Sequence, residues 1–162
     1  MIRSVRHVLL CLALGACAPG ASDGFRDTNQ PISASSRFDA EAFSGAWLLA
    51  ATFEPARQAP VSITYMPEVQ HFRVASSEVP QIAGLYQAGR PGELLPLGGD
   101  RSPLVVMWVD EDFETAAVGT PSGSFGAILD RDGTLPEDRA RAASDILSFN
   151  GWDVSALKRT KP

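Results

Sequence analysis

Short apolar stretches separated by turn sequences follow one another along residues 46–130, and their spacing is the strongest constraint on the fold. In VSITYM (61–66), apolar and polar residues alternate, which is the period of two typical of a strand with one buried face. Pairs such as Pro91-Gly92 mark turns between these stretches. Short strands with turns about every 8 to 12 residues predict an all-β sandwich or barrel.

The strands are followed by one predicted helix. We expect strands at 46–53, 61–66 and 71–77, two within 80–97, and further ones within 103–113, 115–121 and 124–130. Thr134 as N-cap, Pro136 in the first turn and Glu137 match a capping box, and Asn150-Gly151 supplies a C-terminal stop. An apolar stripe at helical spacing predicts packing on the outside of the sheet, with residues Ala140, Ala143, Ile146 and Leu147, and Trp152 at the helix end.

The first 36 residues differ in composition from the rest of the chain. MIRSVRHVLLCLALGAC has a positive start, an apolar run too short to cross a bilayer, and small residues before Cys17, as in a signal peptide. LGAC (14–17) resembles the bacterial lipobox, in which the cysteine is acylated and cleavage occurs just before it. The alternative is an ordinary secretory signal with a coincidental cysteine. We therefore expect a lipoprotein signal peptide (1–16), a lipidated N-terminus with a flexible tether (17–36) and one domain (37–162).

Processing before Cys17 would change the thiols and the charge of the chain. Cys11 would be removed and Cys17 acylated, so the mature domain would contain no thiol for a disulfide, a zinc site or a nucleophile. Loss of Arg3 and Arg6 leaves twelve Lys and Arg against 19 Asp and Glu, a net charge of −7. This acidic balance argues against a nucleic-acid partner and against polybasic attachment to anionic lipids. Acyl chains such as palmitate would hold the protein on a membrane, and Ala18 resembles the signal for sorting to the outer membrane, with the domain facing the periplasm.

Three motifs and the C-terminal tail carry a resemblance to a known family. Gly45-Ala46-Trp47 opens the first expected strand, DEDF (110–113) is an acidic turn ending in an aromatic residue, and Arg131 follows the last strand. In this order, and with the tail LPEDRARAASDILSFNGWDVSALKRTKP (135–162), they resemble the lipocalins, specifically the bacterial outer-membrane lipoprotein type. The resemblance covers residues 38–162 and is weak between 55 and 103.

The resemblance implies an eight-stranded up-and-down antiparallel barrel with one C-terminal helix packed outside. It also implies a closed floor, where Arg131 lies across the ring of Trp47 in a cation–π contact and Gly45 lets the chain turn in at close quarters. Ligand would then enter only at the other end. Only 50 residues separate Phe53 from Leu104, so the middle strands should be short, or one should be missing.

The function that the resemblance implies is binding or carriage of a small hydrophobic ligand, of the fatty acid or lysophospholipid class, in the cell envelope. The small residues Gly126 and Ala127 would either enlarge the cavity or fit a narrower barrel. The alternative is a barrel filled by its own side chains, serving as a structural or protein-interaction module. A cavity of about 300 Å³ or more would favour binding. Strand alternation gives the candidate cavity wall, which is Leu49, Ala51, Phe53, Val61, Ile63, Tyr65, Phe72, Val74 and Phe125.

Residue patterns for catalysis or metal binding are weak. His71 is the only histidine of the mature chain, and GTPSGSFG (119–126) fits neither a nucleophile elbow nor a dinucleotide-binding loop. We interpret Asp110, Asp112 and DRDG (130–133) as turn residues, since a calcium loop needs further ligands. We therefore expect no enzymatic activity, no metal and no cofactor. Alternation leaves open whether Trp108 faces the cavity or the helix.

Overall fold

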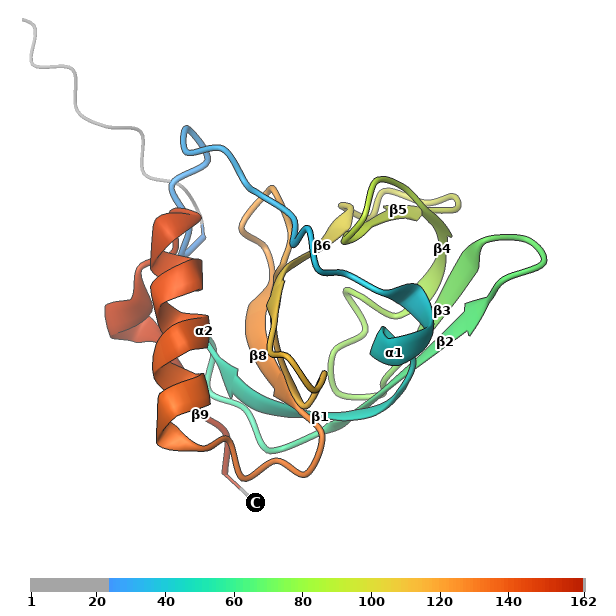
Figure 1. Cartoon of the computed structure of the whole chain (residues 1–162). Helices are drawn as coiled ribbons and strands as arrows, with labels where there is room; N and C mark the ends of the chain where they lie inside the picture. Colours follow the sequence, from blue (N-terminus) through green and yellow to red (C-terminus); the bar gives the residue numbers. More distant parts are fainter. Residues whose placement is uncertain (1–23, 162) are drawn as a thin grey trace, which may run out of the picture.

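Eight antiparallel strands close into a barrel in the computed structural model, which describes residues 24–161 (Figure 1). Each strand pairs with the next in sequence, and β1 pairs with both β2 and β8, which closes the ring. The predicted eight-stranded up-and-down barrel is confirmed. No strand is missing between Phe53 and Leu104, where β2 to β5 are four to seven residues long. The strands are β1 (Gly45–Thr52), β2 (Pro60–Met66), β3 (His71–Ala75), β4 (Gly84–Ala88), β5 (Glu93–Pro96), β6 (Leu104–Val109), β7 (Thr115–Gly119) and β8 (Gly126–Asp130), and β9 (Lys158–Arg159) adds to β1.

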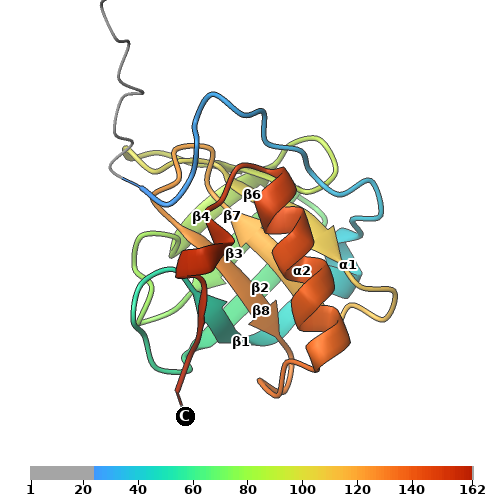
Figure 2. The same cartoon turned by 90° about the vertical axis from the view of Figure 1, so that its left-hand side faces the viewer.

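The two ends of the barrel differ, and we call them the floor and the mouth. The floor is the end at which β1 begins, and the short helix α1 (Ala40–Phe43) lies there. The mouth is the end at which β1 stops, and it carries the loops 53–59, 76–83, 97–103 and 120–125. Figure 2 shows α1 at the right, whereas the described chain begins at the left, on the mouth side.

The helix α2 (Glu137–Phe149) packs outside the barrel against β6 and β7 (Figures 1 and 2). The predicted capping box is wrong, because the Thr134 hydroxyl donates to Asp132 at 2.8 Å and Pro136 precedes the first turn without a side-chain cap. The predicted stop is confirmed: Asn150 is the C-cap, and Gly151 has a φ of 91°. Among the described residues, no helix is both long and apolar enough to cross a membrane.

Buried apolar side chains form two clusters, one on each face of the sheet. The interior cluster fills the barrel and consists of Phe43, Trp47, Leu49, Ala59, Val61, Ile63, Phe72, Val74, Val79, Ile82, Tyr86, Leu94, Leu104, Val106, Val109, Ala116, Val118, Phe125, Ala127 and Leu129. The outer cluster lies between the sheet, α2 and the C-terminal segment, and consists of Ala50, Ala51, Phe53, Val105, Met107, Ala117, Ile128, Leu135, Ala143, Leu147 and Trp152. Burial of both clusters by hydrophobic contact stabilises the barrel and fixes the helix upon it.

Gly126 faces outward, toward Trp152 and Phe53, so the prediction that it enlarges the cavity or fits a narrower barrel is wrong for this residue. Ala127 does lie in the interior cluster. Gly126 pairs with Gly119 on the neighbouring strand, and Trp152 lies across both glycines. A Cβ added at Gly119 would be 2.5 Å from Cζ2 of Trp152. The two glycines therefore form a flat seat for the indole that fixes the end of α2 to the sheet.

We expect Gly119→Val to destabilise the protein by about 1–3 kcal/mol, because the new side chain must displace Trp152 from a fully packed position. Urea unfolding followed by circular dichroism measures the loss. Thr64→Val is the control for adding valine to a strand without crowding, because Thr64 is exposed on β2, and it should leave the urea midpoint unchanged. A urea midpoint for Gly119→Val equal to that of the wild type would show that stability does not depend on the packing of Trp152 against Gly119.

The described part of the predicted tether packs on the barrel instead of hanging free. Arg26 is 2% exposed and donates to the carbonyls of Asn150 at 2.9 Å, Pro121 at 2.8 Å and Gln30. Phe25 stacks on Phe53 with ring centroids 5.4 Å apart. Residues 24–36 are therefore a strap along the domain. The predicted signal peptide and Cys17 lie outside the described residues.

Candidate functional site

The floor is built around Trp47 and Arg131. Trp47 is 1% exposed, its indole N–H donates to the Phe43 carbonyl at 2.9 Å, and the Arg131 guanidinium carbon lies 3.7 Å from the indole centroid. The cation–π pair that the resemblance implied is therefore present. Contacts of this kind contribute about 0.5–2 kcal/mol.

Arg131 also ties the segment around α1 to the barrel. Its guanidinium donates to the carbonyls of Phe113 at 3.0 Å, Ala46 at 2.9 Å, Ala42 at 2.7 Å and Ser44 at 3.1 Å. Burial lowers the pKa of Arg131, and the nearby Glu114 carboxylate opposes that shift. An arginine keeps its charge under such shifts, so the floor holds a permanent cation.

Gly45 explains how the chain approaches this arginine. Its φ is 121°, a conformation that favours glycine. A Cβ at this position would lie 2.8 Å from Nη1 of Arg131. In the Gly-x-Trp pattern, the glycine therefore lets the backbone approach Arg131 closely, and the tryptophan provides the indole ring on which Arg131 lies.

Most of the predicted wall residues lie in the barrel interior. Leu49, Val61, Ile63, Phe72, Val74 and Phe125 belong to the interior cluster, and Tyr65 packs against it. Aromatic rings gather at the floor end, with centroids of Phe43 and Trp47 5.2 Å apart, Phe38 and Phe43 5.2 Å, Phe38 and Phe72 6.1 Å, and Tyr65 and Phe72 4.7 Å. The chain's own rings therefore cover the floor end of the interior.

The prediction that Ala51 and Phe53 line the interior is wrong. The register of β1 against β8 shifts between Leu49 and Ala51, so one extra residue sits in β1 and the alternation reverses. Ala51 and Phe53 belong to the outer cluster. A similar shift in β6 lies between Val106 and Trp108, and it places Trp108 against the outer cluster, on the helix side.

The mouth is closed by a loop. Val79 is 5% and Ile82 is 1% exposed, and both come from the loop 76–83 yet belong to the interior cluster. The Tyr86 hydroxyl donates to the Ile82 carbonyl at 2.8 Å. The side chains of Val79 and Ile82 therefore close the mouth, and we call them the plug. The hydrogen bond from Tyr86 holds their loop in place.

Arg101, from the loop 97–103, lies over the inner side of β4. Gly84 pairs with the interior residue Val74, and a Cβ at Gly84 would be 2.8 Å from Cζ of Arg101. Burial raises the pKa of the Tyr86 hydroxyl, and the charge of Arg101 opposes this shift. Nε of Arg101 is buried without a hydrogen-bond partner among the described residues. The mouth therefore holds the Arg101 guanidinium, whose Nε–H is an unused hydrogen-bond donor among the described residues.

Several hollows lie outside the barrel interior. One of about 720 Å³ runs between the strap and the end of α2, and one of about 710 Å³ lies over β2, β3 and β4. A third, of about 350 Å³, lies between α2 and the outer side of β1 and β8. A small hollow of about 60 Å³ sits at the mouth edge, beside Phe25, Phe53 and Phe125. Inside the barrel, the side chains of the interior cluster, Ile82 among them, are buried.

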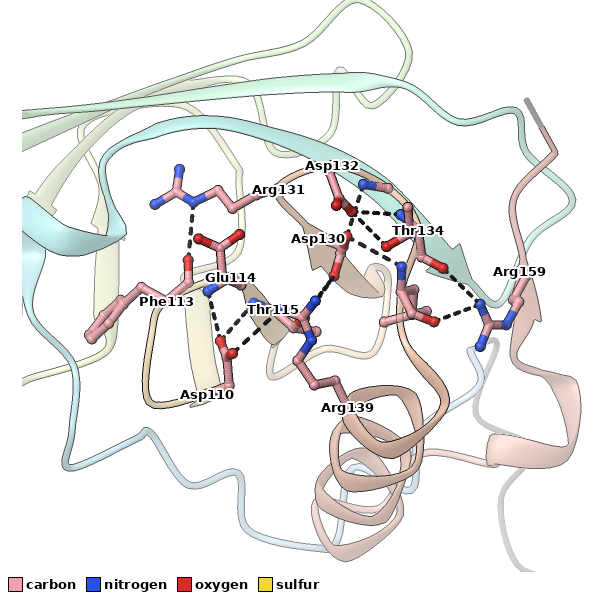
Figure 3. Close-up of polar contacts among 12 residues, drawn as sticks. Asp110, Phe113, Glu114, Thr115, Asp130, Arg131, Asp132, Thr134, Arg139 and Arg159 are labelled. Atoms are coloured by element: carbon pink, nitrogen blue, oxygen red, sulfur yellow. Dashed lines mark hydrogen bonds and ion pairs between the residues drawn. The ribbon is translucent and has the colours of Figure 1, made fainter.

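The acidic turns stabilise the floor side of the barrel (Figure 3). Asp110 accepts from the backbone N–H groups of Glu114 and Thr115, each at 2.7 Å. Asp130, 1% exposed, accepts from the Thr115 hydroxyl at 2.7 Å, and Arg139 lies 3.5 Å from Asp110 and 3.9 Å from Asp130. In residues 24–161, no group of three or more His, Cys, Asp or Glu side chains is arranged to hold a metal ion. Asp110 and Asp130 therefore stabilise the turns by accepting hydrogen bonds.

Comparison with solved structures identifies the architecture. Lobster apocrustacyanin A1 matches with a TM-score of 0.56 at 14% identity, over 75% of this chain and 78% of that one. Apocrustacyanin C2 gives 0.55 at 14% identity, over 74% and 77%. The siderocalin Ex-FABP gives 0.57 at 8% identity, over 75% and 95%. The chain has the lipocalin fold. No family model matches the sequence, and no curated protein matches it.

Sequence reasoning missed three residues that shape the mouth of this lipocalin fold. Ile82 stands in a loop after Pro80, where no periodic pattern marks it as interior. Tyr86 falls within an expected strand, and no motif or strand expected from the sequence includes Arg101. The one available signal was an arginine beside glycines and serines between two apolar strands, which is too common to single out.

Proposed function

We propose that the protein is a lipid-anchored lipocalin of the bacterial envelope that binds a small hydrophobic ligand without covalent chemistry. The observation that carries this proposal is the different closure of the two barrel ends. The floor is tied by four hydrogen bonds to backbone carbonyls and by a cation–π pair. The mouth is closed by the side chains of loops. A ligand that displaced Val79 and Ile82 would enter an apolar barrel with one exit.

The ligand class follows from Arg101. A guanidinium pairs strongly with a carboxylate or phosphate, and here one lies at the entrance of an apolar interior. We propose an amphiphile with one acyl chain and an anionic headgroup, as in a fatty acid or a lysophospholipid. The solved neighbour Ex-FABP, a siderocalin that functions through dual ligand specificities, supports the use of this fold for ligand binding.

We expect Arg101→Met to weaken binding of a fatty acid about tenfold or more, because a hydrogen bond to a charged group contributes roughly 1.5–3 kcal/mol. Displacement of a fluorescent fatty acid gives the affinity. The fatty alcohol of equal chain length should bind both proteins alike. Arg73→Met is the matched control, since Arg73 is an exposed arginine on β3. Equal loss of acid and alcohol would contradict headgroup recognition.

The anchor rests on the lipobox alone. We expect Cys17→Ser to release the protein from the membrane fraction completely, because the acyl chains supply the membrane affinity. Fractionation of the host envelope, with blotting of each fraction, measures the release. Leu14→Val in the same motif keeps the cysteine and is the control for expression and export. Full retention of Cys17→Ser would refute the anchor.

A second function is favoured by the interior cluster, whose apolar side chains, including Ile82 of the mouth loop, are buried. In this alternative the barrel is filled by its own side chains and acts as a structural or protein-interaction module of the envelope. Native mass spectrometry of the mature protein from its host envelope, followed by lipid extraction, separates the two. A fatty acid or lysophospholipid at near-equal stoichiometry supports carriage. A mass equal to that of the acylated chain, with no further lipid, supports the filled module.

A further inference from the structure

The described chain joins the domain at the mouth. Gly24 and Phe25 line the small hollow at the mouth edge together with Thr52 at the end of β1 and Gln81 of the plug loop. The strap is held there, since the Asp27 N–H donates to the Gly151 carbonyl at 2.9 Å. Figure 2 shows this attachment on the side away from α1.

The strap shortens the distance between the domain and any lipid attached to Cys17. Residues 18–23 alone separate Cys17 from Gly24, so these two residues can be at most about 25 Å apart. A free tether up to residue 36 would allow about 65 Å. β1 is eight residues long, which spans about 26 Å. An acylated Cys17 would therefore hold the mouth near the lipid surface, with the floor able to point away.

Exposed apolar side chains gather at the same end. Phe149, the last residue of α2, is 77% exposed, and Phe25 is 39% exposed, and both line the hollow between the strap and the end of α2. Large exposed apolar side chains toward the mouth are Phe25, Phe149, Leu85 and Leu97, whereas Val69 lies at the turn beside the floor and Leu95 pairs with Gln87 near the floor end of β4. Such side chains favour the interfacial region of a bilayer.

We propose that the mouth end rests on the bilayer that carries the acylated Cys17, with Phe149 and Phe25 inserted into the lipid interface. This inference rests on the proposed anchor. Asp27 and Asp153 line the same hollow, so carboxylates lie beside the two phenylalanines and an anionic surface does not strengthen the contact. The barrel entrance then opens onto the membrane, and an amphiphile can pass between bilayer and barrel without crossing the aqueous phase.

Site-specific fluorescence on the lipidated full chain tests the orientation. Ser148→Cys places a thiol-linked fluorophore beside Phe149, and Val69→Cys places the same fluorophore at the floor turn. The vesicles contain phosphatidylcholine and phosphatidylethanolamine with a nitroxide-labelled lipid as quencher. We expect strong quenching at 148 and little at 69, with no change between low and high salt. Adding Phe149→Ser to the Ser148→Cys protein should at least halve the quenching.

Flotation of the same vesicles separates the inference from the anchor on which it rests. Full flotation with equal quenching at 148 and 69 would overturn the orientation while leaving the anchor intact. Failure to float would refute the acyl anchor and, with it, the orientation. Phe149 and Val69 are both largely exposed, so neither change removes a buried contact.

Discussion

Replacing Arg131 by methionine is expected to destabilise the protein by about 2–4 kcal/mol. The change removes the cation from the face of Trp47 and leaves the carbonyls around α1 without their donors, and both losses add. α1 and Phe43 should detach first, because Arg131 ties their segment to the barrel. Urea unfolding measured by tryptophan fluorescence and by circular dichroism reports the loss, and near-ultraviolet ellipticity reports the environment of Trp47.

Two further variants make this result specific. Arg90→Met removes an exposed arginine paired with Glu93 and should leave the urea midpoint unchanged. Arg131→Lys keeps a charge near Trp47 but loses most of the donors, so its stability should lie between those of wild type and Arg131→Met. If Arg131→Met unfolds at the same urea concentration as Arg90→Met, the floor does not depend on this residue.

The sequence was sufficient for the parts of the fold that local patterns determine. Period-two alternation and turn residues predicted the strands, and the resemblance to the lipocalins predicted the floor at Gly45, Trp47 and Arg131. The Asn150-Gly151 stop was readable for the same reason, since a positive φ selects glycine at the end of a helix. Each of these features depends on a few neighbouring residues or on one strict motif.

Features that depend on distant partners could not be read in this way. One extra residue in β1 reverses the faces of Ala51 and Phe53, and no composition marks a bulge. Arg26 stands in a stretch rich in Ser, Pro and Asp, and its partners Pro121 and Asn150 lie 95 and 124 residues away. The sequence alone suggests that Gly126 is a small interior residue, whereas in the structure Trp152 packs against it on the outer face. The strap and the outer cluster therefore emerge only from the assembled barrel.

Ile82→Ala is expected to lower stability by about 2–5 kcal/mol and, at the same time, to speed the entry of a fatty acid. The loss of stability follows from truncating a side chain that is 1% exposed. Faster entry follows from loosening the plug. Stopped-flow fluorescence with a fluorescent fatty acid gives the association rate for wild type and variant. A ligand at 100 times its Kd should return about 2.7 kcal/mol of stability to either protein.

Ile128→Ala is the matched control, because Ile128 is equally buried but lies in the outer cluster beneath α2. It should lose a similar amount of stability, yet bind fatty acid at the rate of the wild type. If the acid binds Ile82→Ala but not the wild type, the variant has only created a cavity, and the barrel is filled by its own side chains. Binding to all three proteins, fastest in Ile82→Ala, requires a mouth that opens in the native protein, because the floor is closed by Trp47 and Arg131.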